Sequence, residues 1–263
     1  MSFQQNKFKE IADTIRSLSE RTNKIKPSKF ATEISSIHEA ALMRGHENGL
    51  DSGKEIQKRE RWDNHIESLK NGWTYGFAGR GINDETFTPY TDVKMNAGYN
   101  ITGLFQYCGI TNLKDILVRY GATLDLALGA NAANLFANSK VTHIPRLLLN
   151  SATGFATAFN SCTDLVSIDE LYVPKVTSFS NTFQNCTNLE EIRITSEIKI
   201  NGFDVHWSEK LSHESLLSII NALANKTADT SGTEWVCTLG TENLNKLSAT
   251  EIAVATEKGW SLV

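Results

Sequence analysis

The sequence predicts an α+β fold in three parts, and three patterns indicate it. Residues 1–70 are rich in charge and carry apolar residues at helical spacing. Residues 71–202 repeat a short motif centred on phenylalanine, which predicts a solenoid of stacked turns. Residues 203–263 alternate helix and strand signals. We therefore expect N-terminal helices that mediate assembly, a short solenoid and a small α/β C-terminal cap.

Two amphipathic helices are expected before residue 40. Their apolar residues recur every three or four positions, at Phe8, Ile11, Ile15 and Leu18 in the first helix and at Phe30, Ile34 and Ile37 in the second. Pro27 disfavours helix at the residue before it, so the chain should turn there. The two helices would pack as a hairpin.

Three glycines form a stripe in the segment that follows. Gly45, Gly49 and Gly53 fall every fourth residue, so they would share one face of a helix. Each glycine inside a helix costs about 1 kcal/mol relative to alanine. Close packing of the same helix from a second copy of the chain would offset that cost. The alternative interpretation is an irregular linker.

The middle region repeats itself, which is its most informative feature. The segments LFQYCGITNLKDI, LFANSKVTHIPRL, AFNSCTDLVSIDEL and TFQNCTNLEEIRI align on Phe105, Phe136, Phe159 and Phe183. Cys or Ser follows each phenylalanine by three residues, and an aliphatic pair comes next. One turn cannot bury such a set alone, so successive turns should stack with the four rings in one column.

The spacing of the repeat is close to one strand plus a short return segment. Two intervals between the phenylalanines are 23 and 24 residues, as in leucine-rich repeats, and the first is 31 residues. The longer interval predicts an insertion within Tyr120–Ala133 or a degenerate turn. Cys108, Cys162 and Cys186 occupy one repeat position, which indicates buried small residues. A metal or disulfide ladder is the alternative.

The C-terminal region carries clear start and stop signals. A helix is predicted over 212–223 with Ser212 as N-cap, followed by a strand at 235–240. Ser248 and Glu251 form a capping-box pattern for a second helix, which Gly259 would end. Residues 260–263 could form a last strand.

Composition and motifs argue against several classes of function. The net charge of −4 gives no electrostatic reason to expect nucleic-acid binding. We find no signal peptide and no apolar run of membrane-spanning length. No catalytic, cofactor-binding or metal-binding motif occurs, so we expect no enzyme and no cofactor. Asp204 and His206 could form a proton relay, but a structural bond is favoured. Asp84 and Glu85 are a poor acid–base pair.

Aromatic residues before and inside the first turn are the candidate binding surface. They are Trp73, Tyr75, Tyr90, Tyr99 and Tyr107, with Phe77 nearby. Aromatic side chains suit the recognition of sugars or proteins. The alternative is that they form the core of an N-terminal cap.

The repeats FNSCTDLVSI and FQNCTNLEEIRI resemble the BspA-type leucine-rich repeat. The segments at 11–37, 76–90, 211–227 and 239–263 are similar to tail-fibre and tail-tip proteins of phages of Gram-positive bacteria. This resemblance implies a virion structural protein of the tail fibre, tail tip or baseplate, made in the host cytoplasm. It implies a homo-oligomer such as a trimer, contacts with other tail proteins, and contact with a host-surface glycan or protein. A bacterial BspA-like surface adhesin and a wall hydrolase of a phage tail tip are the alternatives.

Overall fold

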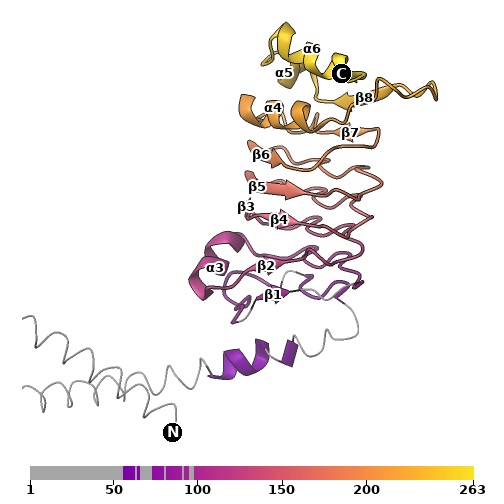
Figure 1. Cartoon of the computed structure of the whole chain (residues 1–263). Coiled ribbons are helices and arrows are strands. Elements are labelled where there is room, and N and C mark those ends of the chain that lie inside the picture. The colour runs from indigo at the N-terminus through magenta and orange to yellow at the C-terminus, as the bar shows by residue number, and fades with distance from the viewer. Residues whose placement is uncertain (1–55, 63, 66–72, 80, 91, 95–97) are drawn as a thin grey trace, which may run out of the picture. The chain divides into compact units, whose positions relative to one another are not determined.

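The computed structural model describes residues 56–62, 64–65, 73–79, 81–90, 92–94 and 98–263 (Figure 1). The chain divides into two compact units, Met1–Lys58 and Arg59–Val263, and almost all described residues belong to the second. The predicted helical hairpin and the stripe of Gly45, Gly49 and Gly53 lie outside the described residues. The predicted domain boundaries at 70/71 and 202/203 stay predictions.

Short parallel strands and four named helices follow a helical segment at 56–62. In chain order they are β1 (Val93–Lys94), α3 (Leu113–Tyr120), β2 (Leu124–Asp125), β3 (His143–Ile144), β4 (Leu147–Leu148), β5 (Ser167–Tyr172), β6 (Glu191–Ile194), β7 (Phe203–Asp204), α4 (His213–Ala222), β8 (Trp235–Thr238), α5 (Thr241–Leu244), α6 (Ala249–Glu257) and β9 (Trp260–Leu262). They form three sheets: β1 with β2, then β3, β4 and β6 all against β5, and finally β7–β8–β9.

Five turns of chain, each built around a phenylalanine, lie on one another in the second unit. We call them the Phe turns; they span 73–79, 101–108, 132–139, 155–162 and 179–186. Consecutive rings of Phe105, Phe136, Phe159 and Phe183 stack with centroids 5.0, 5.6 and 5.7 Å apart. All four rings are fully buried. The ring column predicted from the repeat is therefore confirmed.

The column extends further towards the N-terminus than the repeat indicated. Phe77 stacks on Phe105 at 5.2 Å, and Trp62 stacks on Phe77 at 5.6 Å with nearly parallel planes. His65 Nε2 lies 2.7 Å from the carbonyl oxygen of Gly76. Residues 73–79 thus form a Phe turn before the first one that the repeat alignment identified. Trp62 and His65, from the helical residues before this turn, supply the ring and the polar atom that an earlier turn would supply.

The backbone of a Phe turn is not extended. In the third turn Asn134 and Asn138, two residues before and two after Phe136, have left-handed φ angles of 55° and 58°. The N–H groups of Asn134, Phe136 and Asn138 all donate to carbonyls of the next turn, at 3.1, 2.7 and 2.8 Å. Every second N–H along the turn therefore points towards the neighbouring turn, which links the turns without a strand.

The predicted fold class is wrong. The chain is mixed α/β with parallel sheets, and the described residues do not form an α+β leucine-rich-repeat-type solenoid over 71–202. The strands divide among three sheets of two, four and three strands, because the Phe turns between them are not strand. Helix α3 also lies within the region expected to contain only strands and turns.

Helix α3 accounts for the long first interval of the repeat. Leu113, Ile116 and Leu117 are its buried face, and Gly121 ends it with a left-handed φ of 62°. The predicted insertion within Tyr120–Ala133 is therefore misplaced, because the added helix precedes that segment. The helical spacing of Leu113, Ile116 and Leu117 was visible in the sequence.

The C-terminal elements agree with the individual sequence signals. Ser212 caps α4 by accepting a hydrogen bond from the N–H of Ser215. Ser248 and Glu251 form the complete capping box of α6, and Gly259 adopts a left-handed φ of 84° after it. Strands β8 and β9 fall where the sequence places them and pair in parallel.

Candidate binding surface

Two of the five candidate aromatic residues are exposed on the Phe turns. Tyr75 and Tyr107 are 52% and 51% exposed. Tyr75 lies two residues before Phe77, and Tyr107 lies two residues after Phe105, so both occupy left-handed positions with φ of 57° and 58°. A Cβ placed on Gly103 would fall 2.3 Å from the Tyr75 ring, so the absence of a side chain there seats the ring on the second turn.

The other three candidate residues are more enclosed. Trp73 is 6% exposed and packs edge-on against Phe77 at 6.1 Å. Tyr99 and Tyr90 are half-buried against the core, and Tyr90 also packs edge-on against Tyr120 at 5.2 Å. Tyr75 and Tyr107 are therefore exposed on adjacent Phe turns, whereas Trp73 lies within the core.

Amide and hydroxyl side chains continue the outer side of the Phe turns. Thr157 Oγ1 donates to Asn134 Oδ1 at 2.7 Å, between equivalent positions of the third and fourth turns. Asn160 Nδ2 donates to Gln184 Oε1 at 2.7 Å, between the fourth and fifth turns. These bonds hold the polar side chains in rows across the turns. The sequence analysis did not identify these polar residues as a surface. The alignment of the repeats on phenylalanine nevertheless places them at equivalent positions of successive turns.

The cysteines of the repeat face inward. Cys162 and Cys186 donate through Sγ to the carbonyl oxygens of Phe136 and Phe159 in the preceding turns, at 3.0 and 3.1 Å. Burial raises the pKa of Cys108 to about 11 and that of Cys162 to about 12. All four cysteines of the chain are buried and free. The predicted structural role is confirmed, and a disulfide ladder is excluded.

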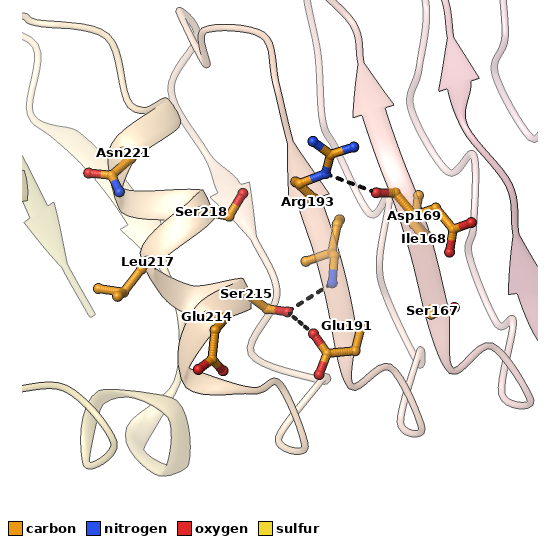
Figure 2. A pocket seen from close by; sticks show the side chains of 11 residues that line it. Ser167, Ile168, Asp169, Glu191, Arg193, Glu214, Ser215, Leu217, Ser218 and Asn221 are labelled. Carbon is orange, nitrogen blue, oxygen red and sulfur yellow. Dashed lines mark hydrogen bonds between the residues drawn. The ribbon is translucent and has the colours of Figure 1, made fainter.

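A shallow hollow of about 480 Å³ lies where β5 and β6 meet α4 (Figure 2). The Oγ atoms of Ser215 and Ser218 accept the N–H groups of Ile192 and Ile194 at 2.9 and 2.8 Å, so α4 closes the open edge of β6. Glu191 accepts from Ser215 at the same place. Ser215, Ser218 and Glu191, which line this hollow, therefore have structural partners within the chain.

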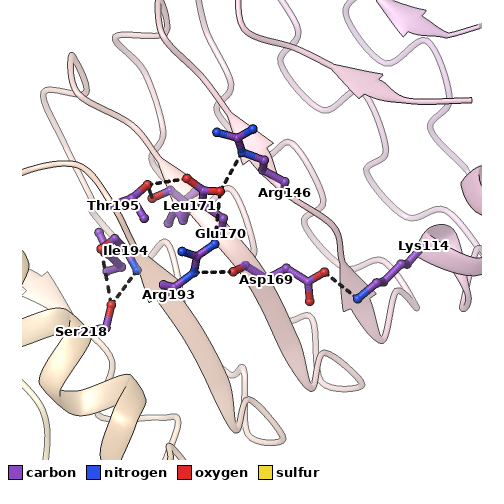
Figure 3. Close-up of polar contacts among 9 residues, drawn as sticks. All are labelled: Lys114, Arg146, Asp169, Glu170, Leu171, Arg193, Ile194, Thr195 and Ser218. Atoms are coloured by element: carbon purple, nitrogen blue, oxygen red, sulfur yellow. Dashed lines mark hydrogen bonds and ion pairs between the residues drawn. The ribbon is translucent and has the colours of Figure 1, made fainter.

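An ionic network crosses the strands beside this hollow (Figure 3). Glu170, whose side chain is 14% exposed, binds Arg146 at 2.7 Å and Arg193 at 3.3 Å. Thr195 Oγ1 also donates to Glu170, at 3.0 Å. Lys114 of α3 reaches Asp169 of β5 at 2.6 Å. The network ties together α3, the segment between β3 and β4, and strands β5 and β6, and Glu170 at its centre has three partners.

The remaining titratable candidates also act locally. His206 Nδ1 lies 2.6 Å from Asp204 Oδ1, and this carboxylate also accepts the His206 N–H. Asp84 binds Thr111 and Asn112 of the next turn; burial would raise the pKa of Asp84, but these hydrogen bonds outweigh it and lower the pKa. Within the described ranges no three His, Cys, Asp or Glu residues are placed to hold a metal ion.

Comparison of the chain with protein-family models, curated proteins and solved structures finds no match in any of the three. Among the helices that the structure describes, none is long and apolar enough to cross a membrane.

Proposed function

We propose that this chain is a non-enzymatic structural protein of a phage virion, in the tail fibre, tail tip or baseplate, and that it contacts the host cell surface. The proposal rests on the sequence resemblance of the repeat and of both flanking regions to such proteins. The observation that supports it most directly is the stacking of the Phe turns. Their backbone N–H groups and buried rings bind one turn to the next, as expected of a rigid structural part.

Such a stack suits binding by an extended surface. Each turn fixes the next through several hydrogen bonds and one ring contact, so rows of outward side chains are held before any ligand arrives. Little ordering entropy is then lost on binding. The carboxylates of Glu170, Asp204 and Asp84 are engaged in structural bonds, which favours contact formation over bond-making chemistry.

The test is the location of the chain in purified particles. Antibodies raised against the full chain should label phage tails released from an induced culture that carries the gene. Mass spectrometry of the same particles should detect the chain in constant ratio to other tail proteins. Label in the cell envelope without particles would instead indicate an adhesin. A lysis band on a cell-wall zymogram would indicate a hydrolase.

Assembly through the glycine stripe is a separate part of the proposal. Light scattering should show the full chain as a homo-oligomer, such as a trimer. Replacing Gly45, Gly49 and Gly53 with leucine should dissociate it, because leucine side chains would hold the helices apart. A chain that is monomeric before substitution would contradict this assembly role.

A further inference from the structure

The outward side of the Phe turns carries no charge. The segments 74–79, 102–107, 133–138, 156–161 and 180–185 contain no Asp, Glu, Lys or Arg, although 21% of the chain is charged. Just beyond them Lys140 and Asp164 pair with each other at 3.0 Å. An ionic partner would therefore find no complementary charge on these segments.

Tyrosine is the unusual residue type at the left-handed positions of this side. Eight non-glycine residues of the structure's described part have left-handed φ; six are Asn, Ser or Thr, and the other two are Tyr75 and Tyr107. Asn visits this conformation readily, whereas for most residues it costs about 1–2 kcal/mol. In the described part of the chain, neither tyrosine hydroxyl has a hydrogen-bond partner, and half of each side chain is exposed. A strained and exposed aromatic residue is typical of a site of contact.

The geometry points to a neutral glycan chain as the occupant of this surface, with the rings of Tyr75 and Tyr107 as its anchors. Sugar rings present apolar C–H faces that pack on aromatic side chains, and hydroxyls that bond to neutral amides and hydroxyls. The turns supply both, because the row of Tyr75 continues through Asn134 and Thr157, and the row of Tyr107 continues through Ser161 and Asn185. This inference rests on the proposed function, since it names the class of host-surface molecule that the virion protein would bind.

The alignment of the turns provides a variant that removes the rings without straining the backbone. Asn134 and Asn138 occupy in the third turn the positions that Tyr75 occupies in the first and Tyr107 in the second. The double variant Tyr75→Asn/Tyr107→Asn should therefore fold at least as well as the original chain. Tyr172→Asn is the matched control, because Tyr172 is a half-buried tyrosine on β5, outside the Phe turns.

The experiment is affinity electrophoresis of the full chain in native gels containing dextran, mannan, galactan or amylopectin, with carboxymethyl-dextran as the anionic arm. We expect retardation by at least one neutral polysaccharide. The double variant should bind it at least tenfold more weakly, and Tyr172→Asn should bind it unchanged. Retardation by none of the neutral polymers, by the anionic polymer alone, or equally for the double variant would overturn the inference.

The two proposals fail in different ways. A chain that is absent from phage particles but loses polysaccharide binding in the double variant contradicts the virion role and keeps the glycan surface. A chain that is present in particles but binds no neutral polysaccharide keeps the virion role and refutes the glycan surface.

Discussion

Removing one ring from the middle of the column should destabilise the whole second unit. Phe136 is fully buried between Phe105 and Phe159, at centroid distances of 5.0 and 5.6 Å with planes within 3° of parallel. Truncation of a buried phenylalanine to alanine costs about 3–5 kcal/mol. Each lost aromatic pair adds about 0.5–1.5 kcal/mol beyond the buried area. Phe136 loses two such pairs, so we expect Phe136→Ala to cost about 4–8 kcal/mol, a large part of the stability of a typical domain.

Guanidinium unfolding, followed by tryptophan fluorescence and far-UV circular dichroism, measures this loss. Phe136→Leu is the control, because the chain itself places an aliphatic residue, Val205, at the position of the next ring after Phe183. The two positions correspond, since the Ser208 N–H donates to the Val205 carbonyl just as the Cys186 N–H donates to the Phe183 carbonyl. Leucine should cost only about 1–2 kcal/mol. A Phe136→Ala variant within about 1 kcal/mol of the original chain would refute the view that the ring column holds the turns together.

Three further predictions follow from particular contacts. Burial raises the pKa of Cys162 to about 12, above the ordinary thiol value near 9, so its contribution to stability is complete below pH 9 and is lost as pH rises towards 12. Chemical denaturation of the original chain and of Cys162→Ser measures this loss as the difference between their free energies of unfolding. That difference should fall by about 2 kcal/mol between pH 9 and 10.5, and a constant difference would contradict the burial of Cys162. Ser215→Ala removes the acceptor of the Ile192 N–H at the edge of β6 and should lower the free energy of unfolding by about 1–3 kcal/mol. Amide exchange at Ile192 should become faster, whereas the control Ser231→Ala, in an exposed turn, should leave it unchanged. Unchanged exchange in Ser215→Ala would show that α4 does not close this edge. Tyr107→Asn should raise the free energy of unfolding by about 1 kcal/mol in thermal scans, because Asn tolerates the left-handed φ of 58°, and a clear destabilisation would mean that the ring stabilises the fold.

The sequence predicted those features that depend on a few local residues. The ring column followed from the spacing of Phe105, Phe136, Phe159 and Phe183, because one turn cannot bury such a residue alone. The caps at Ser212 and Ser248 followed from side chains that accept the first free N–H groups of a helix.

The fold class could not be predicted in the same way, because it depends on backbone conformation between the apolar residues. Asn and Gly near a phenylalanine suggest turns, but they do not show that Asn134 and Asn138 adopt a left-handed φ or that both donate their N–H to the next turn. Division of the strands into three sheets depends on the lengths of the segments between turns. Phe77 was missed because its turn lacks the Cys or Ser of the other repeats, although its spacing from Phe105 was visible.

The position three residues after each phenylalanine separates what folding requires of a Phe turn from what it leaves free. The carbonyl of Phe159 accepts the N–H of Cys162 in its own turn and the Sγ–H of Cys186 in the next. A small side chain with a donor suits this position, and Ser208, three residues after Val205, donates through Oγ to another carbonyl of the preceding turn, that of Cys186, at 3.1 Å. Alanine would fit the space but would leave that second bond unmade. The residues two before and two after the ring point outward, where Thr157 bonds to Asn134 of the neighbouring turn. Asn, Ser and Thr suit both that contact and the left-handed φ, whereas a tyrosine suits the φ poorly and presents an exposed ring, which is why we infer a role in binding for Tyr75 and Tyr107.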